Sequence, residues 1–229
     1  AARKSLNAGI SMTIAALQRR NMVESQVRPS DVTDRRVTAA MTAIPREKFV
    51  PGHLAALAYS DENLDVGGGQ TMLAPSTLAR LVQLADVEAG DSVLVIGGSC
   101  GYAAAIVAQL AAKVVALLPA ANAAAEAAKI CSELGIANVT AVHGILAAGW
   151  AEKAPFNVIV VEGGVEAVPE PLTAQLGDGG RLVAVEVESG LGHAFLLHKK
   201  SQLLSRRDAF QAAAALLPGF EAPKPAFVF

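Results

Sequence analysis

The stretch from Val93 to Ala105, VLVIGGSCGYAAA, constrains the fold more than any other part of the chain. Aliphatic residues run up to Gly97 and Gly98, a turn of small residues follows, and an alanine-rich run begins after Gly101. A strand that is apolar on both faces is typical of a buried parallel sheet. A glycine-rich turn between such a strand and a helix can bring backbone close to a ligand, but it is about as often a packing solution. The motif predicts an α/β fold and leaves ligand binding open.

Strand-like and helix-like runs alternate from residue 90 to residue 187, which predicts a doubly wound sheet. We expect strands at residues 91–98, 113–118, 138–144, 156–164 and 179–188, and helices at 100–112, 120–134 and 168–176. A short connection precedes residues 192–200, so this strand is expected to be an antiparallel edge. The tail from Leu216 is expected to pack on the core, because Phe220, Phe227 and Phe229 would otherwise be exposed.

The first part of the chain is expected to be a helical extension covering residues 1–80, followed by the doubly wound domain at residues 81–229, in one compact unit. Helices are predicted at residues 33–44 and from about Pro75, with a triple-glycine turn before the second. Met12 is expected to be the native start, which would make residues 1–11 an upstream extension.

Composition narrows the classes of function. Hydrophobic residues make up 52% of the chain, so a sizeable core is expected, and the net charge of −2 argues against a nucleic-acid-binding face. Four scattered histidines and two cysteines, Cys100 and Cys131, show no metal-ligand spacing, and the thiols are expected to be reduced. No apolar run approaches the length of a membrane span, and no signal-peptide core is present. These features predict a cytoplasmic protein without metal, membrane or nucleic-acid partners.

Several segments between residues 22 and 190 resemble the protein-L-isoaspartate (D-aspartate) O-methyltransferase family. The matching segments are MVESQVRPSDVTDRRVTAAMTAIPREKFVP, LAYSDENL, GGGQT, VLVIGGSCGYAAAIVAQLA, GIANVTAVHGILAAGW, APFNVIVVEGG and LGDGGRLVAV. The resemblance implies a class I methyltransferase-like (Rossmann-like) sheet, S-adenosylmethionine as methyl donor, and an isoaspartyl residue of a peptide or protein as acceptor. The acceptor carboxylate is already a nucleophile, so no general base is expected and no catalytic residue is assigned.

The resemblance also implies where the ligands bind. The residues at the donor-binding positions are Gly97, Gly98, Ser99, Gly101, Tyr102, Leu118 and Ile145. The residues at the substrate-binding positions, on the N-terminal side of the chain, are Gly69, Gln70, Thr71 and Leu73.

The chain departs from the family pattern at several of these positions. Acidic residues of the pattern are replaced by Val95, Leu118 and Ile145, its middle loop glycine by Ser99, and a hydroxyl near the transferred methyl by Leu73. Loss of the ribose and adenine carboxylates could remove about 3–6 kcal/mol, or roughly 10²- to 10⁴-fold in affinity. The aliphatic replacements suggest a cleft that has become apolar or has filled with core. Two hypotheses stay open: an enzyme with a weakened donor site, and a non-catalytic binding or scaffold protein, in either case with possible homo-oligomers.

Other residues near the expected site have alternative interpretations. Glu162 follows the fourth strand, and we interpret it as a solvated loop acid in preference to a ligand contact. Trp150 is expected to pack under the edge of the sheet. The polar residues Glu24, Gln26 and Arg28 are either near the substrate entrance, as the resemblance implies, or ordinary surface residues.

Overall fold

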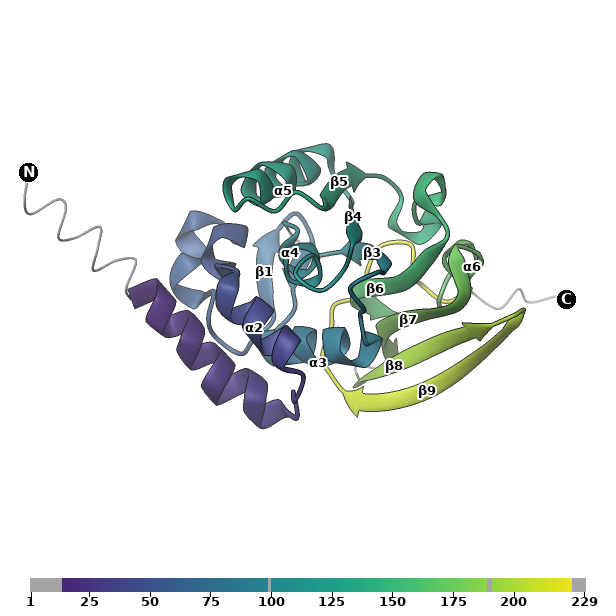
Figure 1. Ribbon diagram of the computed structural model, residues 1–229, viewed down its shortest axis with the longest axis horizontal. Helices are drawn as coiled ribbons and strands as arrows, with labels where there is room; N and C mark the ends of the chain where they lie inside the picture. Colours follow the sequence, from purple (N-terminus) through teal and green to yellow (C-terminus); the bar gives the residue numbers. More distant parts are fainter. Residues whose placement is uncertain (1–13, 99, 189–190, 224–229) are drawn as a thin grey trace, which may run out of the picture.

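A seven-stranded sheet with the order β5-β4-β3-β6-β7-β8-β9 forms the centre of the molecule (Figure 1). The computed structural model describes residues 14–98, 100–188 and 191–223. Four residues named in the sequence predictions, Met12, Ser99, Phe227 and Phe229, lie outside these ranges. The strands are β3 (Ser92–Gly97), β4 (Lys113–Leu118), β5 (Val139–His143), β6 (Phe156–Val165), β7 (Leu176–Glu188), β8 (Leu191–Lys200) and β9 (Leu203–Gln211).

The sheet is parallel from β5 to β7 and antiparallel at β8 and β9, which confirms the predicted doubly wound sheet with an antiparallel edge. The chain runs from β3 outward to β5 and then returns to place β6 on the other side of β3. The strand order therefore reverses between β3 and β6, where α/β proteins of this type bind ligands. β9 was not predicted, because nearly all of its side chains are exposed and give no buried stripe.

Two apolar layers cover the faces of the sheet. Alternate residues of β3 point to opposite layers: Val93 and Val95 join one buried cluster, and Leu94 and Ile96 join the other. The helices are α2 (Arg35–Ala43), α3 (Pro75–Ala85), α4 (Tyr102–Val107), α5 (Ala121–Glu133) and α6 (Glu170–Ala174). The first four contribute buried residues to the first cluster, and Leu172 of α6 belongs to the second. This arrangement confirms that β3 is apolar on both faces because both are covered.

The N-terminal part is largely helical and packs on the first cluster. Residues 14–22 are helical and continue into short turns, and the side chain of Asp34 caps α2 by accepting a hydrogen bond from the Arg36 N–H at 2.7 Å. The short elements are η1 (Val23–Val27), η2 (Arg28–Ser30), η3 (Arg46–Phe49), η4 (Gly52–Leu57), and later η5 (Leu146–Ala148) and η6 (Ala151–Lys153). Buried residues from Met22 to Ala85 lie in the same cluster as those of the sheet, and a boundary near residue 80 stays a prediction.

The triple-glycine turn joins two short antiparallel strands, β1 (Leu64–Gly67) and β2 (Gln70–Met72). All three glycines have positive φ values, between 63° and 93°, which glycine adopts without steric cost. The sequence predicted the turn but not this β1–β2 hairpin, since each strand is too short to show a period.

The segment after β9 returns to the carboxyl end of β6. The Gly164 N–H donates to the Ala215 carbonyl at 2.7 Å, and the Leu217 N–H donates to the Gly164 carbonyl at 2.9 Å. Phe220 is buried, and its carbonyl accepts hydrogen bonds from the N–H groups of residues 166 and 167. The prediction that this tail packs on the core is therefore confirmed as far as Phe220. Within the described ranges, no helix has the length and hydropathy needed to cross a membrane.

Candidate functional site

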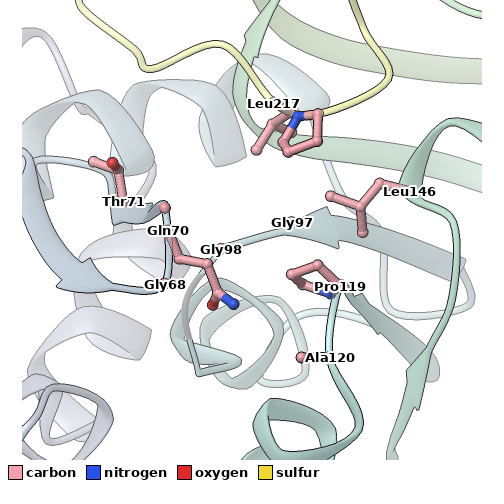
Figure 2. A pocket seen from close by; sticks show the side chains of 11 residues that line it. Gly68, Gln70, Thr71, Gly97, Gly98, Pro119, Ala120, Leu146 and Leu217 are labelled. Carbon is pink, nitrogen blue, oxygen red and sulfur yellow. The ribbon is translucent and has the colours of Figure 1, made fainter.

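A pocket of about 220 Å³ lies at the carboxyl ends of β3 and β4. Five segments build it: the turn of the β1–β2 hairpin, the glycine loop after β3, the residues that follow β4, Leu146, and the C-terminal segment (Figure 2). Its lining residues are Gly68, Gly69, Gln70, Thr71, Gly97, Gly98, Pro119, Ala120, Leu146, Leu217 and Pro218. This is the edge of the sheet at which the change in strand order predicts a ligand.

The glycine loop lies tightly against its neighbours. Gly97, Gly98 and Gly101 have φ values of 81°, 70° and 83°, in the left-handed region that favours glycine. A Cβ on Gly97 would lie 3.1 Å from Leu217, and a Cβ on Gly98 would overlap the carboxyl group of Glu162. Only backbone therefore fits between these neighbours and the pocket, as an approach to a ligand requires.

The pocket brings together only part of the predicted site. Five predicted residues line it: Gly69, Gln70, Thr71, Gly97 and Gly98. In Figure 2, Gln70 reaches from the hairpin toward Pro119 and Ala120. Five others lie elsewhere: Gly101 packs against Ala127 of α5, Tyr102, Leu73 and Leu118 are buried, and Ile145 is exposed. Ser99 is outside the described residues.

The positions where the resemblance implies acids have two different environments. Val95 and Leu118 are buried in the first apolar cluster, whereas Ile145 is 75% exposed and does not line the pocket. Pro119, Ala120 and Leu146 take the corresponding side of the pocket, and we call these three residues the β4 wall. No lining residue of the pocket among the described ranges carries a carboxylate. The sequence missed the β4 wall because its residues give no motif.

Glu162 is buried, so its interpretation as a solvated loop acid is wrong. It lies on β6 directly beside Gly97 of β3 in the sheet register. Burial raises the pKa of its carboxyl group to about 7, although Arg46 and the Leu73 backbone N–H act to lower it.

Arg46 is also fully buried. Its Nε donates to the Ala58 carbonyl and its Nη2 to the Leu73 carbonyl, each at 2.7 Å. Its guanidinium carbon lies 4.9 Å from the centre of the Tyr102 ring, at a distance that allows a cation–π interaction. Burial lowers the pKa of Arg46 and raises that of Tyr102 to about 12. We call Arg46, Tyr102 and Glu162 the buried cluster.

The remaining residues singled out by sequence lie away from the pocket lining. Trp150 is half-buried against the second apolar cluster, and its backbone N–H donates to Gln175 at 2.8 Å. Glu24 and Arg28 form an exposed ion pair at 3.2 Å, and Gln26 donates to the Tyr59 carbonyl. Across the described ranges, no group of three or more His, Cys, Asp or Glu residues is arranged to hold a metal ion.

The comparisons with known proteins agree with this architecture. The sequence profile of a family described as "Protein-L-isoaspartate(D-aspartate) O-methyltransferase (PCMT)" matches residues 17–212. A relative from Anaeromyxobacter sp. (strain Fw109-5), named "Protein-L-isoaspartate O-methyltransferase 2", is 42% identical over 166 residues. These residues are 72% of this chain and 68% of the relative.

Two solved structures share the fold. One, a protein-L-isoaspartate O-methyltransferase, has a TM-score of 0.75 at 29% identity; the match covers 87% of this chain and 66% of that one. The other is a putative enzyme of the same name from Plasmodium falciparum in complex with S-adenosyl-L-homocysteine. It has a TM-score of 0.73 at 19% identity, covering 87% of this chain and 97% of the other. The profile match over most of the chain shows that this protein belongs to the protein-L-isoaspartate (D-aspartate) O-methyltransferase family.

Proposed function

We propose that this protein transfers a methyl group from S-adenosylmethionine to the carboxylate of an isoaspartyl residue in a peptide or protein. The observation that carries the proposal is the composition of the pocket. It joins residues 97–98 of the glycine loop, which the family resemblance assigns to the donor, to residues 69–71 of the hairpin, which it assigns to the acceptor. Relatives that are about 40% identical carry the name of this activity.

The chemistry asks the protein for positioning more than for proton transfer. S-adenosylmethionine supplies a methyl group already activated by a sulfonium. A C–O bond to the acceptor carboxylate forms as the C–S bond breaks, and its electron pair stays on sulfur. The backbone of Gly97 and Gly98 would hold the donor, and Gln70 and Thr71 would contact the acceptor. A pocket that aligns both reactants can supply several kcal/mol of the barrier reduction, about 7–11 kcal/mol at best.

We further propose that the donor is held more weakly than in relatives that keep the acidic residues. The glycine loop fits a donor, because its backbone is exposed to the pocket where side chains would not fit. The β4 wall offers no carboxylate to a ribose diol, and Leu118 is turned into the core. Two absent hydrogen bonds to charged acceptors correspond to a loss of about 10²- to 10⁴-fold in affinity.

The test is calorimetry and thermal unfolding with S-adenosylmethionine and S-adenosylhomocysteine, followed by methyl transfer to an isoaspartyl peptide. The same peptide with ordinary aspartate is the control. Ligand at 100 times its dissociation constant should stabilise the fold by about 2.7 kcal/mol. The proposal is supported if the donor binds and the methyl group is transferred to the isoaspartyl peptide but not to the aspartyl control. Absence of any shift at millimolar ligand would contradict it and favour the non-catalytic binding or scaffold protein.

A further inference from the structure

The buried cluster contains charged and polar side chains whose hydrogen bonds are incomplete. Four buried side-chain polar atoms in the described ranges have no hydrogen-bond partner, and three of them are Arg46 Nη1, the Tyr102 hydroxyl and Glu162 Oε1. Buried ion pairs are weak contributors to stability, because desolvation costs about as much as the attraction returns. An incompletely satisfied polar group in a folded interior calls for an explanation other than stability.

The cluster contacts both sides of the pocket. On the hairpin side, the Leu73 carbonyl accepts a hydrogen bond from Arg46 Nη2 at 2.7 Å, and the Leu73 N–H acts on the Glu162 carboxyl group to lower its pKa. On the opposite side, the same carboxyl group lies directly against Gly98, so closely that no Cβ would fit there. Leu73 follows β2 immediately, so its peptide groups set where the lining residues of the hairpin lie.

The charges that face Glu162 are few. Arg46 of η3 is the charged side chain that acts on it, while Asp61 acts on Arg46, and Arg19 acts on the Tyr102 hydroxyl of α4. An ionised Glu162 accepts a stronger hydrogen bond from the Leu73 N–H than a protonated one does. Ionisation should therefore tighten the hold on Leu73.

We propose that Glu162 and Arg46 are positioning residues that fix the spacing between the β1–β2 hairpin and the glycine loop, and so align methyl donor and acceptor. The consequence for the reaction rests on the proposed function. The interaction of the buried cluster with Leu73 does not depend on that function, and it can be measured on the protein without ligand.

The experiment measures hydrogen exchange of the Leu73 amide without ligand, as a protection factor corrected for intrinsic exchange, at pH values on both sides of 7. In the wild-type protein, Leu73 protection relative to that of amides that exchange only through global unfolding should rise about tenfold as Glu162 ionises, because a bond to a charged acceptor is stronger by about 1–1.5 kcal/mol. Glu162→Gln should show low protection that does not change with pH. Glu166→Gln, which changes an exposed carboxylate four residues later, should behave like the wild type.

The wild-type titration needs no variant, so it stands even where Glu162→Gln fails to fold. Leu73 protection that stays constant through the titration, or that changes equally in wild type and Glu162→Gln, overturns the positioning role. Calorimetry with S-adenosylhomocysteine on the same samples is the second measurement, and Glu162→Gln should raise the dissociation constant about tenfold. If Leu73 protection responds but no donor binds to the wild type, the positioning stands and the proposed function fails.

Discussion

The β4 wall and the hairpin side of the pocket differ in whether charged side chains lie near them. On the β4 side, the family resemblance implies carboxylates at positions 118 and 145, but neither Leu118 nor Ile145 lines the pocket, and the β4 wall carries no carboxylate. On the hairpin side, the resemblance implies a hydroxyl, and the structure has Leu73 with the Arg46–Glu162 pair behind it. The contrast separates two tasks of a transferase pocket. Under the proposed function, contacts on the first side would set how tightly the donor is held, while the buried cluster would set where the reacting groups lie.

Removing the guanidinium of the buried cluster should have the largest effect. Arg46→Met leaves the carbonyls of Ala58 and Leu73 without their donor and removes the positive charge that acts on the buried Glu162 carboxyl group, so we expect a cost of about 3–5 kcal/mol. Urea unfolding measures this change, and Arg20→Met on an exposed arginine should stay within about 0.5 kcal/mol. A loss below about 1 kcal/mol would contradict a stabilising role of the two Arg46 hydrogen bonds.

Introducing an acid at position 118, beside the β4 wall, tests whether this side of the pocket can accommodate a carboxylate. Leu118 is fully buried, so Leu118→Glu should lower the free energy of unfolding by about 3 kcal/mol or more, because it places a carboxylate in the core. The matched variant Ile145→Asp changes an exposed side chain and should stay within about 0.5 kcal/mol. Thermal unfolding compares the two. A Leu118→Glu protein with wild-type stability and tighter donor binding would show that this side is still open.

Glu162 should also make stability depend on pH. Its pKa is raised from 4.5 to about 7, so the folded protein binds the proton more tightly than the unfolded chain. This contribution is complete below about pH 4.5 and is lost as the pH rises through about 7, for a total of up to about 3 kcal/mol. Urea unfolding of wild type and Glu162→Gln across this range gives the difference, since other groups titrate in both. A difference that is constant with pH contradicts the shift.

The C-terminal segment should limit the size of the pocket. The Leu217 side chain packs on Gly97 and Gly163, and the pocket of about 220 Å³ is smaller than the ~300–1,000 Å³ typical of ligand sites. Leu217→Ala should cost about 1–2 kcal/mol in stability, because the side chain is only partly buried, and should tighten donor binding. Leu216→Ala, which changes the exposed neighbour, is the control. Equal dissociation constants in both variants would show that Leu217 does not restrict the donor.

The sequence predicted those parts of the molecule whose residues carry a local signal. The strands β3, β4 and β6 were predicted within a few residues, because aliphatic runs bounded by polar or glycine residues are typical of central parallel strands. β9 was missed because its side chains face solvent. Of the pocket glycines, Gly69, Gly97 and Gly98 were predicted from the family resemblance, and their positive φ values explain why these turns favour glycine.

The rest of the site depends on contacts between segments distant in sequence. Leu217 reaches the pocket only because the tail pairs with Gly164, and nothing in its own neighbourhood indicates this. Glu162 was noticed at the ligand edge of the sheet, but the groups that act on its carboxyl group, Arg46 and the Leu73 N–H, come from a different part of the chain. Whether an acid is solvated or buried is a property of its tertiary neighbours, so sequence could name the residue but not its state.

The smallest expected effect is that of removing the Tyr102 hydroxyl, and it tests whether the hydrogen bonds of the buried cluster are incomplete. Tyr102→Phe removes a buried hydroxyl without a described partner but keeps the ring contact with Phe49, whose centroid lies 5.5 Å away. Unfolding free energy should change by less than about 0.5 kcal/mol, because little hydrogen bonding is lost. Tyr59→Phe is the matched control, since the Tyr59 hydroxyl donates to Glu47, and it should cost about 1–2 kcal/mol. Equal losses in both variants would mean that the Tyr102 hydroxyl does have a partner, and that the buried cluster is a complete network whose contribution is stability.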